Sequence, residues 1–159
     1  MAKALVAYFS ATGMTAHVAE DLAKAAGANL FEIVLAEPYT VADLNWNDRA
    51  SRSSVEMRDE DARPAVAVSA GDVGPYDVVF VGFPVWWYVE PRIIDTFLES
   101  YDFSGKTIVP FATSGGSGLG RAPERMQALA PAAKVLRGRV LNGSPSVAEL
   151  ERWVRSLDL

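Results

Sequence analysis

The stretch from Ser10 to Thr15, which reads Ser-Ala-Thr-Gly-Met-Thr, constrains the fold of this chain more than any other. An apolar run at residues 4–9 leads into it, and apolar residues at the spacing of one helix face follow: Met14, Val18, Leu22 and Ala26. The pattern predicts a buried strand, a short loop and a helix in direct succession. Free N–H groups in the first turn of a helix, together with the helix dipole, favour an anion there. The sequence therefore predicts an anion site at the start of this helix.

The donors in this loop are all neutral. Ser10, Thr12 and Thr15 supply hydroxyls, Gly13 completes the loop, and no Lys or Arg lies within it. Neutral donors suit a phosphate monoester that stays bound better than one that is cleaved. Ser, Thr and Gly are also ordinary helix-capping residues, so this loop alone does not decide between a phosphate site and a plain cap.

Length and composition exclude several classes of protein. The 159 residues are half apolar and fit a single domain over 1–159. No run approaches the ~18 apolar residues of a membrane span, and the first strand begins too early for a signal peptide, so we expect a cytoplasmic protein. The absence of Cys excludes disulfides, cysteine-ligated zinc and iron–sulfur clusters, and the net charge of −5 argues against nucleic-acid binding. We expect the single His17 to lie on a helix surface without a catalytic role.

A second strand is predicted at residues 29–35, after Gly27, a typical helix-ending residue. The strand–helix–strand order predicts two parallel strands joined by a right-handed crossover. Residues 37–74 show no clean periodicity and include a mixed-charge run. We therefore expect a long surface excursion with a solvated charged face and some helix around residues 41–49. Trp46, a large aromatic in this polar stretch, is expected to cover another part of the molecule.

A third strand is predicted at residues 77–83, whose apolar character on both faces is typical of a central strand in a parallel sheet. It runs into a second loop that is rich in aromatic residues: Pro84, Val85, Trp86, Trp87 and Tyr88. Three consecutive aromatic side chains cannot all face the core. At least one is therefore expected in the crevice where open α/β sheets bind ligands.

A fourth strand at residues 107–111 leads into a glycine-rich third loop at 112–120. Four glycines within six residues allow the backbone of this loop to approach a ligand closely. A short fifth strand is predicted at residues 134–141. Ser146 begins a capping box and a last helix whose predicted inward face is Val147, Leu150, Val154 and Leu157.

Other phosphate and nucleophile motifs are absent from the expected places. No Gly-Lys-Ser/Thr follows the first strand, which excludes a P-loop there, and the glycines at 115–120 lack the spacing of a dinucleotide fingerprint. Leu119 stands where a nucleophile elbow around Ser117 would need glycine. The acidic residues of a receiver domain are missing from the ends of the first and third strands.

The three loops together offer a phosphate site, aromatic rings and backbone N–H donors at the carboxyl ends of strands one, three and four. In these segments the chain resembles the flavodoxin-like family: Ser-Ala-Thr-Gly-Met-Thr at 10–15, Gly-Phe-Pro-Val-Trp-Trp-Tyr at 82–88 and Thr-Ser-Gly-Gly at 113–116. The resemblance implies a three-layer, doubly wound α/β fold. It also implies a five-stranded parallel sheet of order 2-1-3-4-5 and bound FMN.

The resemblance further implies which residues contact each part of the cofactor. The phosphate would be held by Ser10, Thr12, Gly13, Met14 and Thr15. The flavin ring would be lined by Pro84, Val85, Trp86, Trp87 and Tyr88, of which Trp86 takes the usual stacking position. The pyrimidine edge would meet backbone donors of Thr113, Ser114, Gly115 and Gly116. No catalytic acid or base and no metal ligand is expected, because the flavin supplies the chemistry.

The chain departs from electron-carrying flavodoxins in its second and third loops. Leu119 stands where those carriers place a second aromatic side chain, and residues 113–120 hold no acidic residue. These differences predict a more open flavin with a less negative reduction potential, since neutral donors favour added negative charge on the ring. Flavodoxins stabilise the one-electron-reduced flavin by flipping a peptide in the second loop, often helped by Gly. Residues 86–90 contain no Gly, so a positive φ there would cost about 1 kcal/mol or more. The resemblance therefore favours two-electron transfer.

Two classes of function fit this sequence. An FMN-dependent oxidoreductase would pass electrons from NAD(P)H or a reductase to a small acceptor such as a quinone. The alternative is a non-enzymatic electron carrier of the flavodoxin type, and the plainest interpretation is the same fold without flavin. We expect a small-molecule electron donor or acceptor, or a redox partner protein, and neither nucleic acid nor a membrane as partner. The sequence leaves open whether the chain forms a homodimer.

Overall fold

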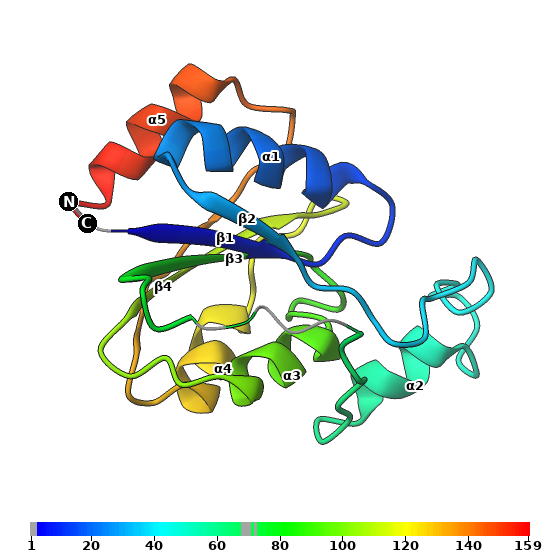
Figure 1. Cartoon of the computed structure of the whole chain (residues 1–159). Helices are drawn as coiled ribbons and strands as arrows, with labels where there is room; N and C mark the ends of the chain where they lie inside the picture. The colour runs from blue at the N-terminus through cyan, green and yellow to red at the C-terminus, as the bar shows by residue number, and fades with distance from the viewer. Residues whose placement is uncertain (1–2, 68–70, 72) are drawn as a thin grey trace.

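The fold is described from a computed structural model that places residues 3–67, 71 and 73–159 (Figure 1). Its centre is a parallel sheet with the strand order β2-β1-β3-β4-β5, as the resemblance implied. A further short strand, β6, pairs with β4. The strands are β1 (Ala4–Tyr8), β2 (Asn29–Glu32), β3 (Val78–Pro84), β4 (Thr107–Thr113), β5 (Lys134–Val135) and β6 (Arg139–Val140).

Two helices cover each face of the sheet, which confirms the predicted three-layer, doubly wound architecture. α1 (Met14–Ala26) and α5 (Val147–Ser156) lie on one face, and α3 (Arg92–Ser100) and α4 (Ala122–Leu129) lie on the other (Figure 1). α2 (Arg52–Arg58) lies beyond the carboxyl end of β1, next to the start of α3, where the Arg92 guanidinium donates to the Met57 carbonyl at 3.0 Å. Among the described residues, no helix is both long and apolar enough to cross a membrane.

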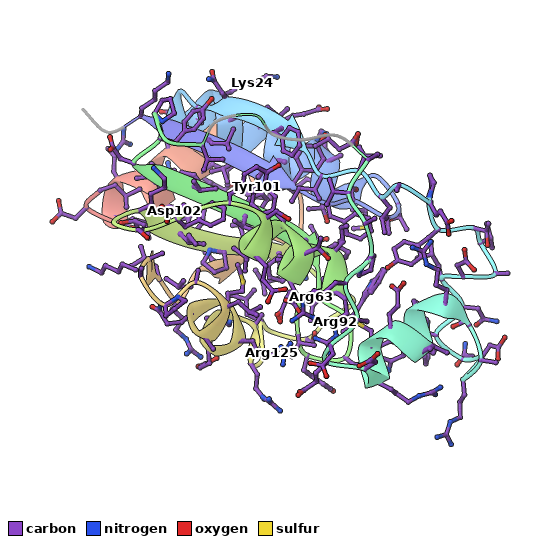
Figure 2. All side chains as sticks on the ribbon, turned by 60° about the horizontal axis from the view of Figure 1, so that its bottom comes forward. Lys24, Arg63, Arg92, Tyr101, Asp102 and Arg125 are labelled. Carbon is purple, nitrogen blue, oxygen red and sulfur yellow. The ribbon has the colours of Figure 1, made fainter. Side chains whose placement is uncertain are left out.

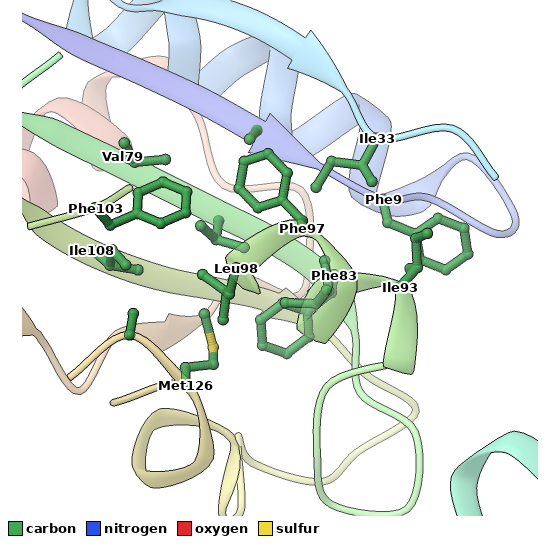
Figure 3. Packing of buried hydrophobic residues seen from close by; sticks show 14 of the residues in the cluster. Phe9, Ile33, Val79, Phe83, Ile93, Phe97, Leu98, Phe103, Ile108 and Met126 are labelled. Atoms are coloured by element: carbon green, nitrogen blue, oxygen red, sulfur yellow. The ribbon is translucent and has the colours of Figure 1, made fainter. Parts of the chain in front are cut away.

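The central strands alternate their side chains between two hydrophobic cores. In β3, Val79 and Val81 pack toward α3 and α4, whereas Val78 and Phe80 pack toward α1 and α5. Figure 3 shows the first of these cores, where Phe97 of α3 lies against the sheet. Because both faces of β3 are buried, its sequence is a continuous apolar run rather than an alternating one.

β3 and β4 differ from their predicted extents by one or two residues, and two other strands differ more. β2 ends at Glu32, because Leu35 forms an isolated antiparallel bridge with Val66 of the excursion instead of continuing the sheet. The fifth position in the sheet is filled by two short strands, β5 and β6, which both pair with β4. Between them, Gly138 has a φ of 74°, and a Cβ there would lie 2.1 Å from the carbonyl oxygen of Pro110. This close approach requires glycine and interrupts the strand.

The helix of the excursion lies later in the chain than predicted. The expected helix around residues 41–49 is wrong, because that segment forms a series of turns. The helix is α2, which begins after Ser51, whose hydroxyl accepts a hydrogen bond from the Ser54 N–H at 3.4 Å. Part of the predicted excursion, residues 68–70 and 72, lies outside the described residues.

The last helix begins where the capping pattern predicts. The Ser146 hydroxyl accepts a hydrogen bond from the Glu149 N–H at 3.2 Å. Its most buried side chains are Leu150, which was predicted, and Trp153, which was not. The other predicted inward residues are only partly buried: Val147, Val154 and Leu157.

Candidate functional site

The first loop combines a helix cap with two open backbone donors. The Ser10 hydroxyl accepts hydrogen bonds from the N–H groups of Gly13, at 3.0 Å, and Ala16, at 3.2 Å. Gly13 has a φ of 93°, which turns the chain into α1. Within the described part of the chain, the N–H groups of Met14 and Thr15 donate to no acceptor. Capping and anion binding are therefore compatible here, because Ser10 uses one first-turn N–H and leaves two for a ligand.

Thr15 connects the first loop to the third. Its side chain is buried, and its hydroxyl lies 2.8 Å from the hydroxyl of Thr113 at the end of β4. The Thr15 hydroxyl is thus engaged within the protein, and its backbone N–H is the group left open. Thr12, in contrast, is exposed and its hydroxyl forms no hydrogen bond with the described residues. The hydroxyls predicted to hold the phosphate therefore have different roles.

The second loop forms a tight turn with strained backbone. The N–H of Trp86 donates to the Val89 carbonyl at 3.0 Å, and the N–H of Val89 donates back at 3.1 Å. Between them, Trp87 has a φ of 47° and Tyr88 a φ of 65°. Two adjacent non-glycine residues at positive φ cost on the order of 1–2 kcal/mol each. The expectation that the lack of Gly keeps this loop out of positive φ is wrong, so it gives no support to two-electron over one-electron transfer.

The third loop holds this turn in place. The Tyr88 carbonyl accepts a hydrogen bond from the Arg121 N–H at 3.0 Å. Gly120 has a φ of 58°, and a Cβ there would lie 2.1 Å from the Tyr88 carbonyl oxygen and 2.8 Å from the Tyr88 Cβ. Glycine at position 120 is therefore needed for the two loops to touch. The glycine-rich stretch is visible in the sequence, whereas this contact is not.

A cavity of about 380 Å³ lies between the second and third loops. Predicted residues line one part of it: Val85, Trp86, Trp87, Tyr88 and Gly115. Ser117 and three residues of the excursion complete it: Leu44, Trp46 and Ser53. Trp46 thus covers the crevice of its own chain, and Leu44 and Ser53 are site residues that no sequence pattern indicates.

The remaining predicted residues do not line this cavity. Ser10 lines a separate, smaller hollow of about 160 Å³, where Tyr39 is also found. Tyr39 contacts Trp86 edge to face, with ring centroids 5.4 Å apart, so the two hollows share an aromatic wall. The three loops therefore meet at adjacent strand ends, but different residues face each hollow.

The third loop satisfies some of its own donors. The Ser114 N–H donates to Asn142 Oδ1 at 2.9 Å, the Gly116 N–H donates to the Ser114 hydroxyl at 3.2 Å, and that hydroxyl donates to the Ser117 carbonyl at 2.6 Å. Among the described residues, the Gly115 N–H has no acceptor. Of the predicted backbone donors, Gly115 is therefore the one that combines an open N–H with a place in the cavity wall.

Tyr39 anchors the excursion to this site. The Arg52 guanidinium lies over its ring, 4.4 Å from the centroid, and its hydroxyl donates to the Glu56 carboxylate. Burial and the neighbouring Glu56 carboxylate raise the pKa of Tyr39 well above its usual range. The phenol therefore stays protonated and keeps α2 beside the cavity.

A buried cluster of arginine and acidic side chains lies directly after the second loop. Arg125 Nε is 3.0 Å from Glu90 and its Nη2 is 3.2 Å from Asp95, while Arg92 Nη1 is 3.4 Å from Asp95. Figure 2 shows Arg92 and Arg125 gathered with Arg63 on one side of the molecule. Glu90 and Asp95 are fully buried, and one oxygen of each has no hydrogen-bond partner in the described part of the chain.

Burial raises the pKa of Glu90 to about 8, with a further increase from nearby Asp95 and an opposing effect of Arg125. In the folded state the Glu90 carboxyl group therefore keeps its proton up to about pH 8, whereas in the unfolded chain it loses the proton near pH 4.5. Stability should fall as pH rises through this window. Between pH 5.5 and 8.5 we expect wild type to lose about 2–3 kcal/mol relative to Glu90→Gln, as measured by urea unfolding. A difference between the two proteins that does not change with pH would contradict the assignment.

A family model described as flavodoxin matches residues 3–157, so the chain belongs to the flavodoxin family. A candidate flavoprotein from Bacteroides eggerthii is 47% identical over 100% of this chain and 99% of that chain, with a TM-score of 0.95. One from Bacteroides uniformis is 49% identical over 97% and 98%, with a TM-score of 0.92. A flavoprotein from Lactobacillus acidophilus, in complex with FMN, shares the fold at 22% identity over 97% and 99%, with a TM-score of 0.71. A comparison with curated proteins finds no significant match.

Proposed function

We propose that this protein is an FMN-binding redox protein whose cofactor lies across the carboxyl ends of β1, β3 and β4. The observation that carries the proposal is the pair of open N–H groups at Met14 and Thr15, together with an aromatic-lined cavity whose third loop contains Thr113, the contact of the Thr15 hydroxyl. The phosphate would bind this pair, with the exposed Thr12 hydroxyl as a further donor. The Lactobacillus acidophilus flavoprotein that shares the fold is in complex with FMN, which supports this choice of cofactor.

The residues of the cavity would bind and orient the flavin ring. Trp86 offers an aromatic surface, and the open Gly115 N–H offers a donor to an electron-rich edge of the ring. Ser53 has a buried hydroxyl oxygen with no hydrogen-bond partner among the described residues, and it also lines the cavity. A buried hydroxyl of this kind favours a polar ligand atom beside it.

FMN supplies the redox chemistry when it is bound, and the protein sets which molecules reach it. We propose an oxidoreductase that passes electrons from NAD(P)H or a reductase to a small acceptor such as a quinone. An open cavity beside exposed Trp87 and Tyr88 and a third loop without acidic residues support this class. The alternative is a non-enzymatic electron carrier, with a redox protein as its partner. The strained turn supports this carrier function, because Trp87 and Tyr88 of the second loop already adopt positive φ.

The test is a reduction assay on the purified, FMN-loaded protein. We expect NADH or NADPH to bleach the flavin absorption with no other protein present, and a quinone to restore it. If neither nucleotide bleaches the flavin while a partner reductase does, the carrier function is correct instead. Failure to bind FMN at all would contradict both functions.

A further inference from the structure

Trp87 stands between three hollows of the surface. It lines the cavity of the candidate flavin site and two neighbouring hollows of about 360 and 530 Å³. Its side chain is 45% exposed. Arginines line the two neighbouring hollows: Arg49 and Arg58 in one, and Arg58, Arg92, Arg121 and Arg125 in the other. Trp46 also lines the first of these two, so an aromatic surface continues from the cavity into the basic region.

The charges of these arginines fall into two groups. Arg92 and Arg125 both pair with buried Asp95, and Arg125 also pairs with Glu60, the acidic residue of the larger hollow. Among the described residues, Arg49, Arg58 and Arg121 form no ion pair. All three are exposed. In a chain of net charge −5, three uncompensated cations around one exposed indole form a local site for an anion.

We propose that this region binds the phosphate groups of a nicotinamide dinucleotide, with Arg58 and Arg121 as the principal ligands and Arg49 at the edge. A guanidinium donates two parallel hydrogen bonds to a phosphate, and exposed Trp87 offers a flat surface for one of the nucleotide's rings. The dinucleotide would thereby reach from the arginines to the candidate flavin cavity. This proposal rests on the proposed function, because it assigns the electron donor of that same site.

The shape of the region favours a small ligand over an acidic protein. The three cations line concave hollows rather than a convex face, and the hollows adjoin the cavity through Trp87. A dinucleotide is long enough to occupy more than one hollow, and it combines aromatic rings with phosphate groups. A protein surface would place its carboxylates over the rim and leave the hollows unfilled.

The test is to titrate the FMN-loaded protein with NADP⁺ and to measure binding by tryptophan fluorescence and calorimetry. NADP⁺ is used because it does not reduce the flavin. We expect the double variant Arg58→Ala/Arg121→Ala to bind NADP⁺ at least tenfold more weakly than wild type. Its affinity should also depend less on salt, since two charged contacts are lost. Arg155→Ala is the matched control, because Arg155 is an exposed arginine on α5, away from the hollows, and it should change nothing.

FMN affinity, measured separately on each variant, distinguishes the two proposals. Unchanged FMN affinity in the double variant shows that the cofactor site is intact and that any loss concerns the dinucleotide. If wild type binds FMN but not NADP⁺, or if the double variant binds NADP⁺ as tightly as wild type, the dinucleotide site is wrong while the FMN site stands. If wild type does not bind FMN, the proposed function itself fails.

Discussion

Replacing Gly120 with alanine should lower FMN affinity at least tenfold and destabilise the protein by about 2–3 kcal/mol. The added Cβ would lie 2.1 Å from the Tyr88 carbonyl oxygen, where no real Cβ can lie, so the second and third loops must move apart. The φ of 58° adds about 1 kcal/mol of strain for a residue with a side chain. Separation of the loops would also weaken the hydrogen bond from Arg121 that holds the strained turn. Flavin titration and urea unfolding measure the two effects.

Gly118→Ala is the matched control in the same loop. A Cβ at Gly118 meets nothing within 4 Å, so we expect near wild-type stability and FMN affinity. The comparison separates a specific contact from a general need for glycine in the loop. Equal effects of the two substitutions would mean that the contact between Gly120 and Tyr88 does not support the cavity.

Removing the Trp86 ring should have the second large effect. Trp86 packs edge to face against Phe9, at 5.9 Å between centroids, and against Tyr39, at 5.4 Å. Each such pair is worth about 0.5–1.5 kcal/mol beyond the area it buries. Because Trp86 is partly buried, we expect Trp86→Ala to cost about 2–3 kcal/mol of stability and to reduce FMN affinity at least tenfold.

Trp46→Ala provides the comparison for the stability effect. Trp46 also lines the cavity, but it is 69% exposed, so its removal should change stability by less than about 0.5 kcal/mol. Thermal or urea unfolding of the two variants is sufficient. A Trp86→Ala protein as stable as Trp46→Ala would show that the Phe9–Tyr39–Trp86 packing contributes little.

The sheet could be predicted from the sequence because its signals are local. Apolar runs with both faces buried fix the central strands, and the alternation of strands and helices fixes their parallel arrangement. The residues of the three loops follow from this, since parallel strands end at one edge of the sheet. The second loop shows what the sequence does not predict. Its aromatic residues could be assigned to the crevice, but the positive φ of Trp87 and Tyr88 could not be predicted.

The excursion could not be predicted, because long-range contacts determine its structure. Helix α2 depends on Ser51 as a cap and on the contact of Arg52 with the Tyr39 ring, and neither produces a periodic pattern. Ser53 enters the cavity wall only through this folding. The charged residues were expected to form a solvated face, yet Arg63 reaches the carboxylate of buried Asp95 at 3.8 Å. Such a contact joins residues that are far apart in the chain, so no regular spacing in the sequence indicates it.

The phosphate is the most direct point at which to test the FMN site. Calorimetric titration of the flavin-free protein should show FMN binding at one per chain and at least tenfold more tightly than riboflavin, which lacks the phosphate. The difference reflects two N–H donors to a charged group, each worth about 1.5–3 kcal/mol. The exposed Thr12 hydroxyl should add to this difference, so Thr12→Ala should bring the affinities for FMN and riboflavin closer together. Equal affinities for the two flavins, or no binding of FMN, would contradict a phosphate site at residues 10–15.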